Sequence, residues 1–264
     1  MLEIKNVHKI FNPGTVNEKH ALKGVNLVLE DGDFVTVIGG NGAGKSTMLN
    51  AIAGVWPIDE GTILIDGEDV TNLPEHKRAK YLGRVFQDPM NGTAATMDIE
   101  DNLALANRRG KRRTLRTRIK SSERANYKEL LKTLGLGLED RMTSKVGLLS
   151  GGQRQALTLL MATLKKPKLL LLDEHTAALD PKTAAKVLEA TEQIVERDKL
   201  TTLMITHNMK DAIAHGNRLI MMMDGNIILD IKGEEKKKLT VEDLLHKFEE
   251  ASGEEFASDK AILG

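Results

Sequence analysis

A glycine-rich stretch between an apolar run and a helical pattern is the feature that most constrains the fold of this chain. Residues 39–47 read Gly-Gly-Asn-Gly-Ala-Gly-Lys-Ser-Thr and follow the largely apolar residues 34–38. Residues 48–53 space their apolar side chains as a helix does. A strand, a glycine loop and a helix start, in this order, are the setting that a phosphate-binding loop (P-loop) requires. The sequence therefore predicts an α/β fold with a nucleotide-phosphate site at this loop.

The residue types in this stretch suit a nucleotide polyphosphate and a magnesium ion. Glycines let backbone N–H groups approach a polyphosphate, and a helix that begins near Lys45 adds unpaired N–H donors and the positive end of its dipole. Lys45 offers a charge for the β- and γ-phosphates, and Ser46 offers a hydroxyl to Mg²⁺, which prefers oxygen ligands. A glycine-rich turn with a chance lysine is the alternative, and the flanking patterns argue against it. The residues expected to contact the nucleotide here are Gly39, Asn41, Gly42, Ala43, Gly44, Lys45, Ser46 and Thr47.

Composition narrows the class of protein further. The 264 residues carry 38 Lys and Arg against 38 Asp and Glu, so no overall charge favours nucleic acid as a partner. The sequence has no cysteine, which excludes disulfides and thiolate metal sites and fits a reducing compartment. No apolar run approaches the ~20 residues that span a bilayer. We therefore expect a cytoplasmic protein that reaches a membrane only through a partner.

Apolar periodicity predicts how the chain is organised. The first 65 residues mix an antiparallel β region with the strand before the P-loop, and the sequence becomes helical and highly charged from Gln87 to about Val146. The basic run 108–113 could bind anionic lipid or RNA, but without interleaved aromatic residues a solvated surface is the favoured interpretation. We expect a domain over residues 1–235 with a helical subdomain inserted at about 88–146. We also expect a charged C-terminal helical tail, 236–264, with an amphipathic helix that follows a charged linker at 232–238.

Two acidic residues follow a predicted buried strand. Four consecutive leucines, 169–172, suit a strand of a parallel sheet that is covered on both faces. Asp173 and Glu174 then stand at its carboxyl end, where open α/β sheets place their ligands. We expect Asp173 to hold Mg²⁺ and Glu174 to orient or deprotonate the attacking water.

Residues 149–153, Leu-Ser-Gly-Gly-Gln, form a second candidate anion site. They precede a helical pattern, so a serine and two glycines stand at a helix N-terminus. One nucleotide needs only one such site within a chain. The second anion site is explained if two copies of the chain associate head to tail, so that residues 149–153 of each copy contact the phosphate bound by the other.

These motifs together resemble those of the ABC ATPases, the nucleotide-binding subunits of ABC transporters. The resemblance runs from about Leu2 to Asp230, and residues 149–153 match the signature motif of the family. Residues 39–47 match its Walker A motif and residues 169–174 its Walker B motif with the following glutamate. The resemblance implies a P-loop NTPase (RecA-like) core with an antiparallel β subdomain and an inserted helical subdomain.

The resemblance also implies roles for further residues. Phe11 would stack on adenine, Gln87 would contact Mg²⁺ or water, and His207 would sense the γ-phosphate. The implied catalytic set is Lys45, Gln87, Glu174 and His207, and the implied metal set is Ser46, Gln87 and Asp173. Residues implied to act across a dimer are Ser150, Gly151, Gly152, Gln153 and Asp180.

Several of these residues have a simpler interpretation. Asp180 precedes Pro181 at a helix start and could be only a cap, while Phe11, Gln87 and His207 could be ordinary packing or polar residues. Phe11 stands where tyrosine is commoner in the family, a change that keeps the stacking face. His175 stands where the family usually has proline, and we assign it no role in proton transfer.

The function implied is ATP hydrolysis that powers transport. ATP would close a head-to-tail dimer of two copies, and the helical subdomain after Gln87 would move a membrane permease. The chain would lie on the inner face of the cell membrane and would serve import of a small solute such as an amino acid, with a separate solute-binding protein. A soluble ABC ATPase of the iron–sulfur cluster assembly type is the alternative.

Overall fold

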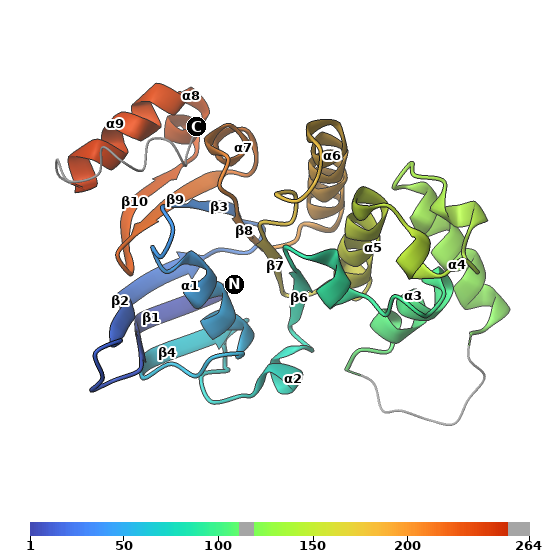
Figure 1. Ribbon diagram of the computed structural model, residues 1–264, viewed down its shortest axis with the longest axis horizontal. Coiled ribbons are helices and arrows are strands. Elements are labelled where there is room, and N and C mark those ends of the chain that lie inside the picture. The colour runs from blue at the N-terminus through green and yellow to red at the C-terminus, as the bar shows by residue number, and fades with distance from the viewer. Residues whose placement is uncertain (111–118, 253–264) are drawn as a thin grey trace.

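The computed structural model describes residues 1–110 and 119–252, which form two sheets and a helical lobe (Figure 1). Strands of the larger sheet are β3 (Phe34–Ile38), β6 (Leu82–Val85), β7 (Leu169–Asp173), β8 (Thr202–Ile205), β9 (Arg218–Met223) and β10 (Asn226–Lys232). Their order in the described part of the chain is β10-β9-β3-β8-β7-β6, parallel except for β10. Other elements cover both faces of this sheet, so every residue of β3 and β8 is buried. Their sequences therefore lack the alternation of apolar and polar residues that a half-exposed strand shows.

The smaller sheet packs with the P-loop helix on one face of the larger sheet. Its antiparallel strands are β1 (Leu2–Phe11), β2 (Lys19–Leu29), β4 (Glu60–Ile65) and β5 (Glu68–Asp69), in the order β2-β1-β4-β5. Helix α1 (Lys45–Ala53) lies between the two sheets (Figure 1). Apolar side chains of α1, such as Leu49, share one core cluster with Val37 of β3 and Leu27 of β2.

Glycines at two P-loop positions are required by close backbone approach. A Cβ atom at Gly39 would lie 2.1 Å from the carbonyl oxygen of Met222, and one at Gly44 would lie 2.6 Å from that of Ala21. Gly44 also has φ +102°, in the region that favours glycine. The loop can therefore turn from β3 into α1 only with these glycines in place.

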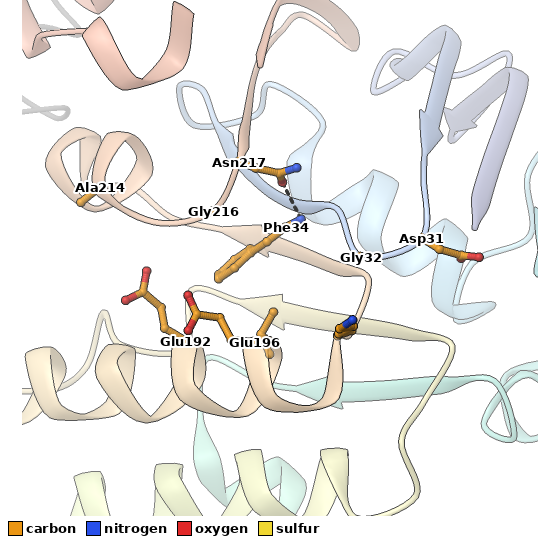
Figure 2. Close-up of a pocket in the computed structure, with 10 residues that line it drawn as sticks. Asp31, Gly32, Phe34, Glu192, Glu196, Ala214, Gly216 and Asn217 are labelled. Carbon is orange, nitrogen blue, oxygen red and sulfur yellow. Dashed lines mark hydrogen bonds between the residues drawn. The ribbon is translucent and has the colours of Figure 1, made fainter. Parts of the chain in front are cut away.

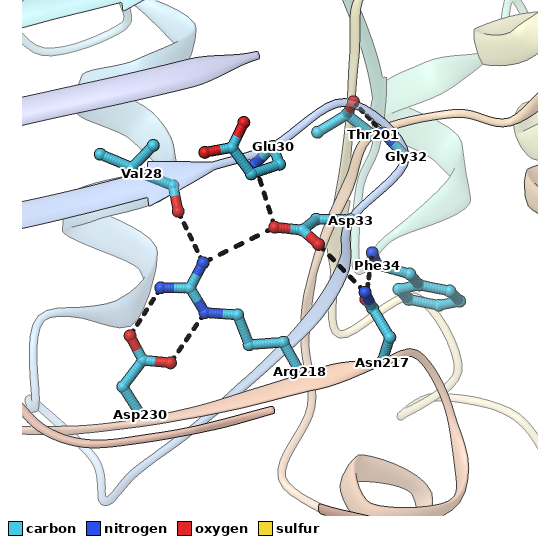
Figure 3. A network of polar contacts seen from close by, with 9 residues as sticks. All are labelled: Val28, Glu30, Gly32, Asp33, Phe34, Thr201, Asn217, Arg218 and Asp230. Atoms are coloured by element: carbon cyan, nitrogen blue, oxygen red, sulfur yellow. Dashed lines mark hydrogen bonds and ion pairs between the residues drawn. The ribbon is translucent and has the colours of Figure 1, made fainter. Parts of the chain in front are cut away.

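The opposite, amino end of β3 is fixed by a polar network around Arg218 (Figure 3). The guanidinium donates to both carboxylate oxygens of Asp230 at 2.7 and 2.6 Å, and to the carbonyl of Val28 at 2.6 Å. Asn217 accepts from the N–H of Phe34 at 2.8 Å and donates to Asp33 at 3.0 Å. These contacts join β2, β3, β9 and β10, so the strand that carries the P-loop is held at both ends.

The helical lobe has a core of its own. It comprises η1 (Pro89–Gly92), α3 (Ile99–Asn107), α4 (Ser121–Lys132), η2 (Leu138–Asp140), η3 (Val146–Leu148) and the start of α5 (Gly151–Thr163). Leu103, Tyr127 and Leu157 are fully buried in one cluster. Arg108 of the basic run approaches Glu123 within 3.3 Å, and Arg109 donates to the carbonyl of Ala162 at 3.1 Å. Residues 111–113 of that run lie outside the described residues.

Helices near the C-terminus cover the remaining faces. They are α6 (Pro181–Asp198), α7 (Met209–Ala214), α8 (Glu234–Lys238) and α9 (Val241–Ser252), while α2 (Glu75–Arg78) lies near the end of α1. The amphipathic helix α9 docks on the body, where Leu244 and Phe248 share a cluster with Met209 and Met221. Among residues 1–110 and 119–252, every helix falls short of the length or the apolar character that a membrane span requires.

The expectation of a charged linker at 232–238 is wrong, because Lys232 ends β10 and residues 234–238 form the helix α8. The Lys236 side chain of α8 is buried, and its ammonium donates to the carbonyls of His215 and Gly216, which holds this segment against the body. Burial lowers the pKa of Lys236 to about 8. The charge pattern alone is compatible with a linker, because the carbonyls that Lys236 contacts are distant in sequence.

Candidate active site

A cleft of about 340 Å³ opens at the carboxyl edge of the larger sheet. It collects residues that follow β3, β6, β7 and β8, the edge at which open α/β sheets bind ligands. The residues that line it are Phe11, Lys19, Ala21, Asn41, Gly42, Ala43, Gly44, Lys45, Ser46, Thr47, Gln87, Glu174 and His207. Most of the residues that the sequence analysis assigns to one nucleotide therefore line the same cleft.

Lys45 lies inside the P-loop rather than in solvent. Its side chain is buried, and its ammonium donates to the carbonyls of Gly39 at 2.7 Å and Gly40 at 3.0 Å. Burial lowers the pKa of Lys45, and the nearby carboxylates of Glu174 and Asp173 oppose that shift. The site thus holds a fixed cation close to two acids.

The first turn of α1 keeps its anion-binding capacity. Gly44 precedes the helix, no described side chain caps α1, and its first turn contains no acidic residue. The opening N–H groups and the positive dipole end therefore face the cleft without a competing carboxylate.

Glu174 and His207 form a close pair across adjacent strands. The Oε1 atom of Glu174 lies 2.7 Å from Nε2 of His207, and the Glu174 side chain is 9% exposed. The backbone N–H of Glu174 donates to the carbonyl of Ile205 at 3.1 Å. Because β7 and β8 are parallel neighbours, residues just beyond their ends meet at one point.

Arg84 lies between Asp173 and Asn50 at the edge of the site, and the sequence analysis missed both Arg84 and Asn50. Arg84 Nη2 donates to Oδ1 of Asn50 at 2.7 Å and lies 3.7 Å from Oδ2 of Asp173. Burial raises the pKa of Asp173, while Arg84 and Lys45 lower it and Glu174 raises it. A lone arginine within the apolar run 82–86 is the signal that could have pointed to Arg84.

Lys19 is a second cation at the cleft that the sequence analysis missed. It stands at the start of β2, far from the P-loop in sequence, yet a Cβ atom on Gly42 would lie 3.1 Å from its Nζ. No local motif marks it, because its position depends on how β2 packs beside the loop.

The donor set of the site suits Mg²⁺. Ser46, Gln87 and Asp173 offer hydroxyl, amide and carboxylate oxygens, the hard ligands that Mg²⁺ prefers. Within residues 1–110 and 119–252 there is no cluster of three or more His, Asp or Glu that could hold a metal by itself. An ion here would depend on phosphate oxygens for much of its coordination, as Mg²⁺ at nucleotide sites does.

Phe11 lines the cleft and also packs against other residues. Its ring meets Trp56 edge to face, with centroids 5.0 Å apart and planes at 84°, and the Lys9 ammonium lies 5.5 Å from its centroid. The ring is therefore held in place while one side faces the cleft.

The serine–glycine motif lies outside this cleft. Ser150 caps α5: its Oγ accepts from the N–H of Gln153 at 3.3 Å, and Gln153 Oε1 accepts from the N–H of Ser150 at 3.2 Å. Ser150, Gly152 and Gln153 line a separate hollow beside Thr183, and α5 lies well away from α1 in Figure 1. One chain alone does not bring its two anion motifs together.

Asp180 and His175 both make hydrogen bonds to α6. Asp180 Oδ1 accepts from the N–H of Thr183 at 3.1 Å, which caps α6 and lowers the pKa of Asp180. His175 is 2% exposed, and its Nε2 lies 3.1 Å from Oγ1 of Thr191. Burial, with a smaller effect of His215, lowers the pKa of His175 to about 4, so the ring is neutral near pH 7.

A larger cavity of about 660 Å³ lies at the amino end of β3, beside Phe34 and Asn217 (Figure 2), whereas the P-loop follows the carboxyl end of this strand. Phe34, Glu192, Glu196 and Asn217 are among its lining residues. No residue assigned to the nucleotide lines it, so size alone is a poor guide to the active site of this protein.

A parallel sheet whose carboxyl edge carries a glycine loop, a buried lysine and an acid pair defines a P-loop nucleotide-binding protein. Residues 22–177 match the ABC transporter family, and the chain belongs to this family. Cassettes of the family bind and hydrolyse ATP, so this chain is an ATPase.

Individual relatives cover nearly the whole chain. It is 47% identical over 252 residues to the tyrosine transport ATP-binding protein of Clostridioides difficile (strain R20291), a match that covers 95% of this chain and 100% of that protein. It is 30% identical over 253 residues to the bacitracin export ATP-binding protein BceA of Halalkalibacterium halodurans, covering 93% and 94% of the two chains.

A solved structure described as a dimeric bacterial ABC transporter cassette, MJ0796, is also similar. It matches with a TM-score of 0.75 and 32% identity over 88% of this chain and 98% of that one. The predicted family and fold class are confirmed.

Proposed function

We propose that this chain is the ATP-hydrolysing subunit of a transporter that imports a small solute such as an amino acid. The observation that carries the proposal is the cleft that unites Lys45, Glu174 and His207 in a chain 47% identical to a tyrosine transport ATP-binding protein. The soluble iron–sulfur alternative gains no support from these relatives, whose names refer to transport and export.

In this proposal the P-loop holds the triphosphate. Lys45 leaves its loop carbonyls to contact the β- and γ-phosphates, and the amides of residues 42–46 donate to phosphate oxygens. Phe11 stacks on the adenine ring. Ser46, Gln87 and Asp173 would hold Mg²⁺, which would neutralise charge on the phosphates.

Glu174 activates the water. Its carboxylate accepts a hydrogen bond from the attacking water and takes up its proton as the γ-phosphate is transferred. The one N–H at Nε2 of His207, 2.7 Å from Oε1 of Glu174, holds that carboxylate in position or, when the ring turns, donates to the γ-phosphate. The P-loop amides and Lys45 stabilise the charge that develops on the phosphate oxygens.

A second copy of the chain completes the site. Ser150, Gly151, Gly152 and Gln153 lie outside the cleft of their own chain, and they form a helix N-terminus able to grip the γ-phosphate bound by a partner. The description of MJ0796 as a dimer supports this arrangement. Since both copies grip the same phosphate, ATP favours the closed dimer and its hydrolysis favours opening.

The helical subdomain is the proposed contact with the permease. We assign residues 1–235 to the ATPase domain, about 88–146 to this subdomain and 236–264 to a helical tail. Met90, Leu105 and Leu148 are exposed apolar residues of the lobe, at 45%, 54% and 72% exposure, and suit an apolar partner. Such a partner would hold the chain on the inner face of the membrane, and an importer would add a solute-binding protein.

The Glu174→Gln variant tests the chemistry. It keeps the shape of the side chain but removes the base, so we expect kcat to fall by about 10²- to 10⁴-fold while ATP binding persists. Glu189→Gln, an exposed change on α6, is the control and should leave kcat unchanged. Lys45→Ala should abolish ATP binding measured by calorimetry. Retained hydrolysis in Glu174→Gln, or retained affinity in Lys45→Ala, would contradict these assignments.

The transport role needs a separate test. The chain is co-expressed with a membrane protein that co-purifies with it, and uptake of labelled tyrosine is followed in vesicles. We expect uptake that requires ATP and that is lost with Glu174→Gln. Efflux in place of uptake would favour an exporter, as the similarity to a bacitracin export protein would then suggest. Failure to associate with any membrane protein would favour a soluble role.

A further inference from the structure

The loop between β7 and α6 carries Glu174 in a backbone conformation that needs support. Glu174 has φ +46°, in the left-handed region that non-glycine residues rarely adopt. Such a conformation costs free energy and persists only where the surroundings hold it. Within the loop, the N–H of Ala177 donates to the carbonyl of Glu174 at 3.0 Å, and Asp180 caps α6 at the far end.

His175 provides a tether at the near end of this loop. Its side chain is 2% exposed and that of Thr191 is fully buried, and the two meet at 3.1 Å. The Thr191 hydroxyl donates to the carbonyl of Val187 at 2.8 Å, which uses its one proton. The Thr191 oxygen must therefore accept, and Nε2–H of His175 must donate.

The part of α6 that receives this bond is itself fixed. Leu188 and Ile194 are buried on the sheet in a cluster with Leu172 of β7. The next residue after Thr191, Glu192, accepts from Nδ1 of His215 at 2.7 Å, just beyond the end of α7. Figure 2 shows Glu192 on α6 facing the segment from Ala214 to Gly216. One turn of α6 is thus joined to the loop after Glu174 and to the helix that follows His207.

We propose that His175 is a positioning residue for the catalytic site: its hydrogen bond to Thr191 fixes the loop so that Glu174 stays against His207. The role rests on the proposed function of Glu174 as the group that activates water. His175 is 2% exposed and does not line the cleft, so it acts only through the backbone that it shares with Glu174.

The expected effect is on the rate of chemistry and not on nucleotide binding. The P-loop contacts do not involve this loop, so the KM for ATP should be unchanged when the tether is removed. A displacement of about 1 Å in a reacting group costs up to about 100-fold in rate. We therefore expect kcat to fall by about 10- to 100-fold.

The main test is the double variant His175→Leu/Thr191→Val. It replaces both hydrogen-bonding partners by apolar groups of similar size, a change that is nearly neutral for stability, whereas Thr191→Val alone leaves a buried N–H unpaired. The double variant should unfold near the wild-type temperature and show the lowered kcat with wild-type KM. His175→Gln, which places an N–H donor at similar reach, should retain most of the wild-type kcat.

A matched pair at the other end of the bond repeats the test without changing His175. Thr191→Ser keeps the hydroxyl and should keep kcat, whereas Thr191→Val should lower it. The same kcat in the double variant and the wild type would overturn the proposal, as would equal losses in His175→Gln and His175→Leu. Glu174→Gln is measured beside them: if it hydrolyses ATP normally, the catalytic assignment itself fails and the positioning role fails with it.

Discussion

Replacement of Arg78 by methionine should loosen the helix that carries the P-loop. The Arg78 side chain is 2% exposed, although it is charged. Its guanidinium donates to carbonyl oxygens of Leu73 at 2.8 Å, Ala51 at 2.7 Å, Ile52 at 2.8 Å and Thr71 at 2.9 Å. Ala51 and Ile52 belong to the last turn of α1, where the Ala51 carbonyl otherwise accepts, within the described residues, only from the N–H of Gly54 at 3.2 Å and the dipole favours a cation.

The size of the stability loss in Arg78→Met depends on the carbonyl groups that lose their hydrogen-bond donor. Hydrogen bonds to a charged group contribute about 1.5–3 kcal/mol each, but burying the guanidinium offsets much of that gain. Methionine removes the charge itself and leaves the buried carbonyls of Ala51 and Ile52 without its donors, at a cost of about 1–3 kcal/mol each, and it recovers part of this by filling space. We expect the free energy of unfolding to fall by about 3 kcal/mol, which corresponds to a Tm lower by about 6–12 °C in a protein of this size.

Thermal and urea denaturation measure the effect, with Lys77→Met as the control. Lys77 is the exposed neighbour of Arg78 on α2, so its replacement should change the free energy of unfolding by less than about 0.5 kcal/mol. Arg78→Lys keeps the charge but not the planar donor geometry, and should lie between the wild type and Arg78→Met. If Arg78→Met is as stable as Lys77→Met, the guanidinium does not hold the end of α1.

Three further results are expected. Gly152→Ala should destabilise the protein, because its Cβ would lie 2.0 Å from Cγ2 of Thr183, and Thr183→Ser in the same chain should restore stability in a denaturation experiment. The pKa of His175 is about 4 when folded, against an ordinary 6.5, so below about pH 6.5 the unfolded state binds the extra proton more readily. Stability should therefore fall by up to about 3 kcal/mol between pH 6.5 and pH 4, and this loss should be absent in His175→Leu. Phe11→Ala should weaken ATP binding about 10-fold in calorimetry through lost stacking, whereas Phe11→Tyr should bind as the wild type does.

The parts of the fold that the sequence predicted best are contiguous in the chain. The run from β3 through the P-loop into α1 carries its strand pattern, its glycines and its helix start within 20 residues of one another. Asp180 and Pro181 likewise mark the start of α6 by local capping alone.

The contacts that the sequence could not predict join distant segments. Arg84 reaches Asp173 only because β6 lies beside β7, and Lys19 reaches the P-loop only because β2 packs beside it. The sequence named both Glu174 and His207, but their 2.7 Å contact depends on the pairing of β7 with β8. Domain boundaries and residue roles remain predictions.

The central claim is that one ATP is bound by two copies of the chain, and complementation tests it most directly. Lys45→Ala removes the phosphate cation of one copy, and Ser150→Phe blocks the serine–glycine motif that would cover the nucleotide of the other. Each variant alone has two defective sites and should be inactive. Their mixed dimer regains one intact site, formed by Lys45 from the Ser150→Phe chain and Ser150 from the Lys45→Ala chain.

The measurement is ATP hydrolysis by equimolar mixtures of the purified variants. A mixture of Lys45→Ala with the double variant Lys45→Ala/Ser150→Phe contains no intact site and serves as the control. We predict that hydrolysis appears when Lys45→Ala and Ser150→Phe are mixed and is absent from the control. A mixture as inactive as its two components, or full activity in Ser150→Phe alone, would contradict the shared site.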